Sequence, residues 1–285
     1  MKKIIIIVLV TAASSLSVCA QQNIHEFSVH GGGGLSTLVY QLSSGERNIG
    51  FGGDFGLGYT FVRSNERITS TGRIFRKNWG LYTGLGLGVY HSKAKLDTQE
   101  LVSKNQTDYD GDRFDFHTTF EKYAETQSVL SLNIPIMGIY QYRQYYVMGG
   151  FKFAIPLHAL YASKDVTLTN EAYYDLYKNW AKSQEFAGCG TFRNKDYDGE
   201  LDLGPSILLA LEGGIRWRLS SNLSLFTGVY FDYGLSNAFN GSPKWFIKYD
   251  QYNPADFSTN SVLSLTADPV RLMAAGLKVR LTLEK

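Results

Sequence analysis

Cysteine and long apolar runs are both scarce in this sequence. Only two of its 285 residues are cysteine, and Cys19 lies in the extreme N-terminal segment, which leaves Cys189 alone in the remainder. We therefore expect no disulfide within the mature chain. Beyond residue 20 no run of about 18 apolar residues occurs, so the sequence predicts no membrane-spanning helix there.

An excess of charge of one sign is also lacking. The chain has 28 Lys and Arg against 26 Asp and Glu, which gives a formal net charge of +2. No basic stripe and no recognisable nucleic-acid-binding motif accompanies this small excess, so we expect no nucleic-acid partner.

The N-terminus has the three parts of an export signal. Two lysines precede an apolar stretch from Ile4 to Val10, and small residues around Ala20 resemble a cleavage site. This order predicts a Sec-type signal peptide over residues 1–20, followed by one domain over 21–285. The alternative is a lipoprotein signal, in which Cys19 becomes the lipidated N-terminus, because residues 16–19 loosely match that motif.

Strict alternation of apolar and polar residues is the dominant pattern of the mature chain. Between Phe51 and Phe61 every second residue is apolar or glycine, while Asp54 and its even-numbered neighbours occupy the other face. A strand with this pattern is apolar on one side only. Strands that cross a bilayer need roughly 9 to 11 residues, longer than most strands of soluble proteins. The pattern therefore predicts a transmembrane β-barrel.

Eight stretches carry this pattern, so we expect an all-β, antiparallel transmembrane barrel of eight strands, with ten as the alternative count. They cover residues 25–37, 50–62, 79–92, 127–141, 144–158, 206–219, 223–236 and 270–283. Short connections follow the fourth and sixth stretches and a medium one the second, whereas long ones follow the first, third, fifth and seventh. With a periplasmic N-terminus, the long connections become extracellular loops.

The longest connection, residues 159–205, exceeds a plain hairpin loop, and we expect it to have structure of its own or a function. Its aromatic residues at near-helical spacing allow two interpretations. They either form a short amphipathic helix or pack over the barrel rim. These residues are Tyr173, Tyr174, Tyr177 and Trp180.

Four segments resemble small outer-membrane β-barrel proteins typical of Bacteroidota, known as PorT-like or OmpA-like barrel domains. The segments are Gly53 to Tyr59, Trp79 to Gly86, Leu132 to Ile136 and Gly276 to Leu281. The resemblance covers nearly the whole mature chain and implies residence in the bacterial outer membrane. It also implies contact with outer-membrane lipid and recognition by the barrel-assembly machinery. The matching motifs are architectural and specify no reaction.

The alternation places charged side chains on the inward face of the predicted barrel. An interior formed by eight strands is just wide enough for side chains, so we expect these groups to pair and fill the lumen. The alternative is a gated polar passage. The residues are Asp54, Lys152, Glu212, Arg216, Arg218, Asp232, Lys278 and Arg280.

Two acidic stretches repeat the same theme in predicted loops. Carboxylates close to a glycine can surround Ca²⁺, although the first stretch has Arg113 where an EF-hand loop needs glycine. Asp-Gly is also a strong hairpin signal, so hairpin tips are the favoured interpretation and a weak calcium site the alternative. The acidic residues are Asp108, Asp110, Asp112, Asp196, Asp198 and Glu200.

Catalytic motifs are not evident. The sequence contains no Gly-x-Ser-x-Gly element and no metal-type histidine pair, and His117 and His158 are isolated. We expect no enzyme and no cofactor apart from the calcium alternative. The leading hypothesis is a barrel that acts through its extracellular loops on an unknown ligand or envelope protein, or in envelope structure. A small-solute channel, a subunit of an export or assembly machine and, last, an enzyme are the alternatives.

Overall fold

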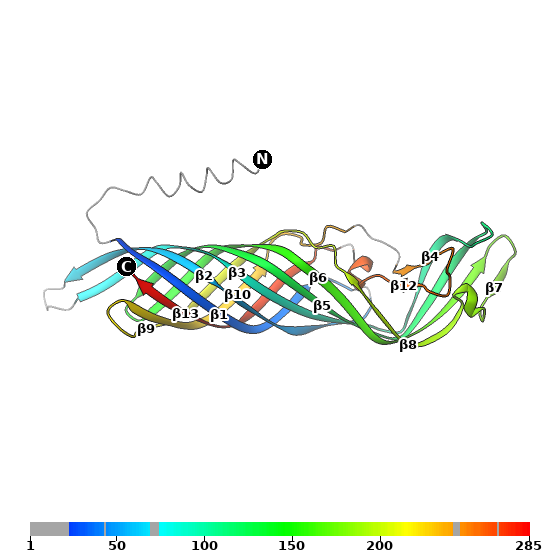
Figure 1. The fold of residues 1–285 in the computed structure, drawn as a ribbon, viewed down its shortest axis with the longest axis horizontal. Coiled ribbons are helices and arrows are strands. Elements are labelled where there is room, and N and C mark those ends of the chain that lie inside the picture. Colours follow the sequence, from blue (N-terminus) through cyan, green and yellow to red (C-terminus); the bar gives the residue numbers. More distant parts are fainter. Residues whose placement is uncertain (1–22, 43, 69–73, 242–245, 267) are drawn as a thin grey trace, which may run out of the picture.

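The computed structural model describes residues 23–42, 44–68, 74–241, 246–266 and 268–285. The predicted signal peptide and the alternative lipidation site at Cys19 lie outside these ranges. Long antiparallel strands dominate the molecule, which is drawn out along one axis (Figure 1). Within the described ranges, no helix has both the length and the apolar character needed to cross a membrane.

Eight strands form a closed antiparallel ring, which confirms the predicted fold class. Each strand pairs with the next, and the last returns to pair with the first over Glu26 to Val39, which closes the barrel. The strands are β1 (Asn23–Val39), β2 (Glu46–Ile68), β3 (Ile74–Leu96), β5 (Arg113–Tyr142), β6 (Tyr145–Tyr174), β9 (Ser206–Arg218), β10 (Leu223–Gly234) and β13 (Arg271–Glu284).

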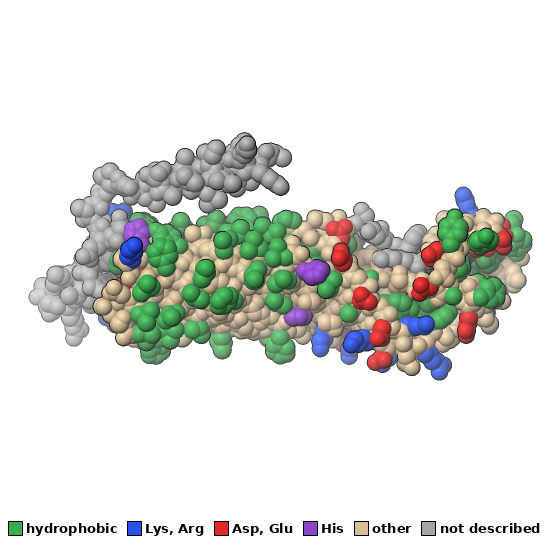
Figure 2. Space-filling view, viewed as in Figure 1, with side chains coloured by type: hydrophobic (Ala, Val, Ile, Leu, Met, Phe, Trp, Pro, Cys, Tyr) green, Lys and Arg blue, Asp and Glu red, His purple; other side chains and the backbone are tan. Residues whose placement is uncertain are grey.

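Alternation along each strand gives the barrel two chemically different faces. On β2, for example, Phe55 and Leu57 are exposed, whereas Gly56 and Gly58 are buried on the inside. On the face shown in Figure 2, hydrophobic side chains are spread over the barrel, whereas most of the charged side chains lie on the extension. The exposed apolar set, which we call the outer belt, includes Val29, Leu35, Phe55, Leu57, Leu81, Leu85, Ile136, Tyr140, Val147, Phe151, Ile207, Leu211, Val229, Leu277 and Leu281.

The connections between barrel strands differ at the two ends of the ring. Asn23 and Lys285 lie at one end, here called the terminal end, together with the two-residue connection Arg143-Gln144 and the turn between β9 and β10. The predicted short connections are therefore confirmed. The connections between β3 and β5, β6 and β9, and β10 and β13 lie at the opposite end, here called the loop end.

Two predicted connections are wrong. The link after β1 is short, because β2 already begins at Glu46 and pairs with β3 from there. At Gly45, φ is 118° and an added Cβ would lie 2.1 Å from the Lys95 carbonyl oxygen, so glycine makes this tight link possible. The predicted medium connection after residue 62 is largely strand, since β2 and β3 stay paired up to Ile68 and Ile74.

At the loop end β5 and β6 continue far beyond the barrel and form an extension. Each strand has 30 residues, and β4 (Gln99–Thr107), β7 (Asn179–Ala181) and β8 (Gly190–Glu200) pair with them. The predicted loop 159–205 thus has structure of its own, with the short helix η1 (Glu185–Ala187) between β7 and β8. The amphipathic helix is wrong, because Tyr173 and Trp180 are cross-strand partners on β6 and β7.

A hydrophobic core fills the extension, which we call the distal core. The connection between β10 and β13 folds against the extension and contributes β11 (Ile247–Lys248), β12 (Ser258–Thr259) and the short helix η2 (Val262–Leu265). Phe116, Phe120 and Leu168 on the long strands meet Phe246 and Leu263 in this core. The same cluster continues into the loop end of the barrel, where Tyr90, Leu208 and Tyr230 belong to it.

Candidate functional site

The interior of the barrel is a cluster of charged and aromatic side chains from most of its strands. Asp54 comes from β2, Lys152 from β6, Glu212 from β9, Asp232 from β10, and Lys278 and Arg280 from β13. All six side chains are largely buried. Even-numbered positions of β2, β9, β10 and β13 face inward, so these side chains share the lumen.

Opposite charges in the lumen are paired. Lys278 Nζ lies 2.9 Å from Asp54 Oδ2 and 3.7 Å from Glu212 Oε2. Arg280 donates to Glu212 Oε1, and Lys152 donates to Asp232. Three carboxylates thus face three cations, so the lumen carries no uncompensated charge from these six groups.

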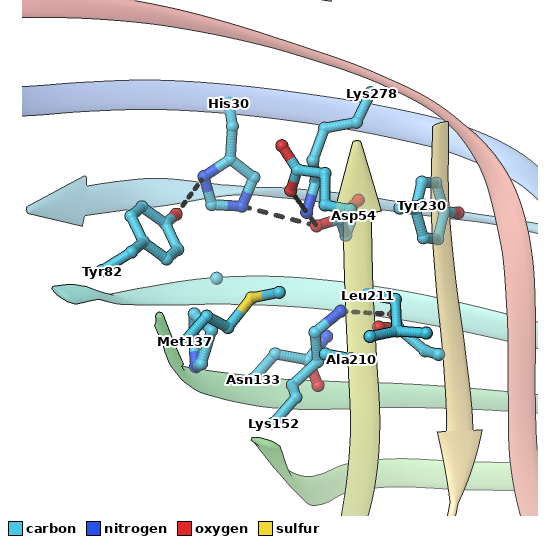
Figure 3. Close-up of a pocket in the computed structure, with 14 residues that line it drawn as sticks. His30, Asp54, Tyr82, Asn133, Met137, Lys152, Ala210, Leu211, Tyr230 and Lys278 are labelled. Carbon is cyan, nitrogen blue, oxygen red and sulfur yellow. Dashed lines mark hydrogen bonds and ion pairs between the residues drawn. The ribbon is translucent and has the colours of Figure 1, made fainter. Parts of the chain in front are cut away.

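One member of the lumen cluster, His30, was not singled out from the sequence. Its Nε2 lies 3.4 Å from Asp54 Oδ2, and its Nδ1 lies 3.2 Å from the Tyr82 hydroxyl. Figure 3 shows His30 and Lys278 meeting at Asp54. The sequence does place His30 inside the barrel, because His30 directly follows the outward Val29 and successive side chains of a strand point to opposite faces.

Aromatic rings complete the packing around these charges. The Arg280 guanidinium carbon lies 4.5 Å from the centre of the Tyr82 ring, a cation–π contact. Tyr146 donates its hydroxyl to Glu212 Oε1 at 3.0 Å. Lys278 lies 5.4 Å from the Tyr230 ring centre.

The space left between these side chains is small. A cavity of about 10 Å³ lies between Asp54, Lys152, Glu212 and their neighbours (Figure 3). That volume is close to the minimum for a single water. Asp54 Oδ1 is buried without a hydrogen-bond partner among the described residues, so it is the group that such a water would satisfy. The barrel interior is therefore filled at this level.

Two predicted lumen residues lie at the terminal end instead of the centre. Arg216 donates to Glu284 and to Gln141, and it lies 3.7 Å from Glu26 Oε1. The side chain of Arg218 is 55% exposed and lies 3.8 Å from Glu284 Oε2. Arg218 ends β9, where the barrel opens, so its expected position inside the lumen is wrong.

The two acidic stretches adopt different structures. Asp108 Oδ1 accepts hydrogen bonds from the amides of Asp110 and Asp112, which shapes a hairpin tip between β4 and β5. Two other carboxylate oxygens of this tip bind tyrosines, since Asp108 Oδ2 accepts from Tyr174 and Asp112 Oδ2 from Tyr177.

The second acidic stretch is not a hairpin tip. Asp196, Asp198 and Glu200 lie along β8, and Asp196 accepts from the amide of Asp165. Among the described residues no group of three or more His, Cys, Asp or Glu could hold a metal ion. The calcium alternative therefore has no support from the geometry of either stretch.

The far end of the extension exposes several large aromatic side chains, which we call the tip surface. It comprises Tyr109, Tyr177, Trp180, Phe186 and Tyr252. Tyr109 and Tyr252 pack edge to face at 6.4 Å, and Gln251 ties the neighbouring loop to the Asp108 carbonyl. Trp180 lies between Tyr173 and His117 at 5.0 and 4.8 Å.

The two isolated histidines and the single cysteine have ordinary structural surroundings. His117 bonds to Glu100 at 2.5 Å, and His158 is exposed on β6. Cys189 is buried beneath η1, and burial raises the pKa of its thiol to about 11. A thiol with a raised pKa is a poor nucleophile at neutral pH.

Together the fold and the site define a closed antiparallel β-barrel with an apolar exterior and a filled, charged interior. No protein-family model matches the chain, and neither does any curated protein. Among solved structures the chain is similar to the outer membrane protease OmpT from Escherichia coli, with 9% identity, a TM-score of 0.32 and coverage of 95% of this chain and 100% of OmpT. The chain is also similar to the P. putida toluene transporter TodX, with 8% identity and a TM-score of 0.13; the match covers 94% of this chain and 90% of TodX. Likeness at this level assigns no activity to the chain.

Proposed function

We propose that this chain is a non-enzymatic outer-membrane β-barrel protein whose filled barrel anchors an extracellular recognition module. The observation that carries this proposal is a contrast along one molecule. The barrel is apolar outside and closed by paired charges inside, whereas the extension has its own core and exposes aromatic side chains at its tip.

The outer belt supports the membrane location. Exposed apolar side chains occur on all eight barrel strands, and together they exceed the apolar patch that a soluble monomer exposes. Because both faces alternate along every strand, this belt needs no long apolar run in the sequence. Outer-membrane barrels have short periplasmic turns and longer extracellular loops, and this supports a periplasmic terminal end and an extracellular extension.

The extension supports recognition as the function. Its sheet and distal core hold the tip surface far from the barrel, as Figure 1 shows. Exposed Tyr and Trp are enriched where proteins bind partners, because they bury much area with few rotatable bonds. The partner would be an extracellular ligand or another envelope protein, and the barrel itself would meet outer-membrane lipid and the barrel-assembly machinery.

The belt can be tested on the purified protein. We expect it to need detergent and to run at different positions on a gel before and after heating, because a closed barrel resists detergent until it is heated. A protein that is monomeric and soluble without detergent would contradict the membrane location.

The orientation can be tested with one epitope at each end of the molecule. Gly111, at the tip of the β4–β5 hairpin, has φ of 89°, and an added Cβ would meet nothing within 4 Å, so an insertion there is tolerated sterically. An epitope at Gly111 should bind antibody on intact cells. The matched insertion between Ser220 and Ser221, in the turn at the terminal end, should bind antibody only after lysis. The reverse pattern would contradict the orientation.

A further inference from the structure

We propose that a groove on the outer face of β2 and β3 binds one phosphate-bearing membrane lipid, with an acyl chain along the groove and the phosphate beside His91 and Lys93. This site deepens the proposed function, since it rests on the barrel being in a membrane. It would make the barrel wall a specific lipid site as well as an anchor.

The groove is a shallow, open hollow in the outer belt. Its volume is about 580 Å³, within the range of roughly 300 to 1,000 Å³ that is usual for small-molecule sites. Phe51 and Phe55, which are 75% and 62% exposed, stand on β2 beside it. The lining comprises Gly32, Phe51, Gly52, Gly53, Asp54, Phe55, Leu87, Val89, His91 and Leu130.

Glycines and a β-bulge create the hollow. Gly33 and Gly53 are cross-strand partners on the outer face of β1 and β2, so no side chain covers the backbone there. The pairing of β2 with β3 shifts register between Ile49 and Gly53, which marks a bulge. At Gly52 an added Cβ would lie 2.4 Å from the Val89 carbonyl oxygen, so the close approach of the two strands requires glycine.

The position of the groove in the outer belt determines what kind of molecule can enter it. Leu57 and Leu85 are exposed on the same strands toward the terminal end, and Leu35 and Ile49 are exposed toward the loop end. In a membrane these neighbours contact hydrocarbon, so the hollow between them opens to lipid chains and not to water. A flexible acyl chain can follow such an irregular apolar surface.

The outer face of β3 changes from apolar to cationic at the loop end of the groove. Val89, His91, Lys93 and Lys95 succeed one another on this face, and Lys93 and Lys95 are exposed. His91 Nδ1 bonds to the Phe51 carbonyl oxygen at 2.8 Å, which turns its other ring nitrogen away from the backbone. His91 lines the groove and Lys93 is the next outward residue, whereas Lys95 lies opposite Glu46. An imidazole and an ammonium group beside the end of an apolar groove complement a phosphate at the end of an acyl chain.

The test counts the phospholipids that stay bound to the full-length protein. The protein is reconstituted in nanodiscs of phosphatidylethanolamine and phosphatidylglycerol, released into mild detergent and weighed by native mass spectrometry. We expect one phospholipid retained per chain. Val89→Trp, which fills the groove, should raise the dissociation constant of the lipid about tenfold, equivalent to roughly 1.4 kcal/mol of binding free energy, and thereby lower the retained fraction.

A matched control separates the groove from the belt as a whole. Val147→Trp makes the same substitution at an exposed belt position on β6 and should retain lipid like the unmodified protein. Lys93→Ala should reduce retention while leaving the groove open, because only the phosphate contact is lost. Both tryptophan variants must keep the heat-modifiable gel mobility of a folded barrel.

Three results would overturn the site. They are no retained phospholipid on the unmodified protein, equal retention in Val89→Trp and Val147→Trp, and a dimer that Val89→Trp dissociates without any lipid loss. The last result would assign the groove to a second copy of the chain. If the protein is a heat-modifiable barrel but retains no lipid, only the lipid site is contradicted. If the protein is soluble without detergent, the proposed function is contradicted as well.

Discussion

Glu212 is the carboxylate on which the pairing of the barrel interior depends most. It accepts from Arg280 and from Tyr146, and it lies 3.7 Å from Lys278. Glu212→Gln would leave Arg280 buried without its counter-charge. We expect the barrel to lose roughly 3 to 5 kcal/mol of unfolding free energy, as is usual when one partner of a buried pair is removed. Urea unfolding of the protein in lipid vesicles would measure this loss.

The control for Glu212 is an ion pair at the surface. Arg218 is half-exposed and lies 3.8 Å from Glu284. Because water screens such a pair, Arg218→Gln should cost at most about 1 kcal/mol. Equal losses in the two variants would show that the interior charges are solvated and that the lumen is open to water.

Glu125 presents a second buried carboxyl, which lies at the loop end and outside the outer belt. Its oxygens accept from Tyr123, Gln127, Ser261 and the amide of Val262, and thereby hold η2 in the distal core. None of these four donors is a cation, so burial dominates and raises the pKa of Glu125 above its ordinary value of 4.5.

Because the pKa of Glu125 is raised, the stability with which η2 packs in the distal core depends on pH. The folded state holds the proton of Glu125 more tightly than the unfolded state, so this contribution to stability is fully present below pH 4.5 and is lost as the pH rises through the folded-state pKa. We expect the amides of Val262 and Leu263 to become less protected from hydrogen exchange, relative to Glu125→Gln at the same pH, as the pH rises above 4.5.

The exposed Glu121 on the same strand provides the control for this measurement. Glu121→Gln should keep the pH dependence of the unmodified protein, because its carboxyl is in water. If protection of η2 relative to Glu125→Gln increased with pH, the direction assigned to the pKa of Glu125 would be wrong.

At the scale of single residues, alternation predicts which side chains face inward but not which of them meet. Asp54 and Glu212 could be placed in the lumen because their strand neighbours Phe55 and Leu211 are outward. To predict that Asp54 pairs with Lys278, one must know the strand register, which depends on all eight strands together. Arg218 was misplaced because the position at which the barrel ends is a property of the turn.

At the scale of the strand, we expect the energetic cost of a charge on the outer face of β9 to depend on its depth in the membrane. Leu211 lies near the middle of the outward positions of β9, whereas Leu219 follows its end. Leu211→Arg should cost about 2 to 4 kcal/mol because it places a charge at the bilayer midplane, and Leu219→Arg about 0 to 1 kcal/mol because it lies at the interface. Reversible unfolding in vesicles measures both.

Ala210, the inward neighbour of Leu211, tests which face of β9 points into the barrel. Ala210 is buried and lines the small cavity beside Glu212. Ala210→Ser adds one polar atom to a polar site and should cost less than Leu211→Arg. Opposite sensitivities at these two positions would show that the inner and outer faces have been exchanged.

Barrel strands and extension strands differ in how well the sequence predicts them. The eight barrel strands were evident because lipid outside and charges inside demand opposite residue types on alternate positions. The continuation of β5 and β6 was not, because water bathes its outer face and its pairing is broken by register shifts around Lys122. These bulges interrupt the period-two signal on which the prediction rested.

The aromatic residues of β6 and β7 show the same limit. Tyr173, Tyr177 and Trp180 fall at near-helical spacing by coincidence, since a tight turn from Asp175 to Lys178 separates two strands there. Lys178 itself has φ of 51°, a conformation that a turn requires and a helix does not allow. Spacing alone could not distinguish the two structures.

At the scale of the whole molecule, the two interiors suit different tasks. The distal core is mainly apolar and packs the sheet of the extension against the connection between β10 and β13, whereas the lumen around Asp54 and Glu212 is filled by paired charges. A barrel of eight strands leaves space for side chains only, and the cavity of about 10 Å³ between them agrees with that limit. In the proposed function, the membrane part serves to hold the extension outside the cell.

The last prediction is that this barrel does not conduct. Solute passage would require the pairs Lys278–Asp54, Arg280–Glu212 and Lys152–Asp232 to separate within the low-dielectric lumen. Each separation leaves buried charges uncompensated, which costs roughly 3 to 5 kcal/mol per pair. In planar bilayers we expect no steady open-channel current from the unmodified protein, and Glu212→Gln should lower stability more than it alters permeation. Steady currents that this substitution leaves unchanged would show that ions take a path these pairs do not close.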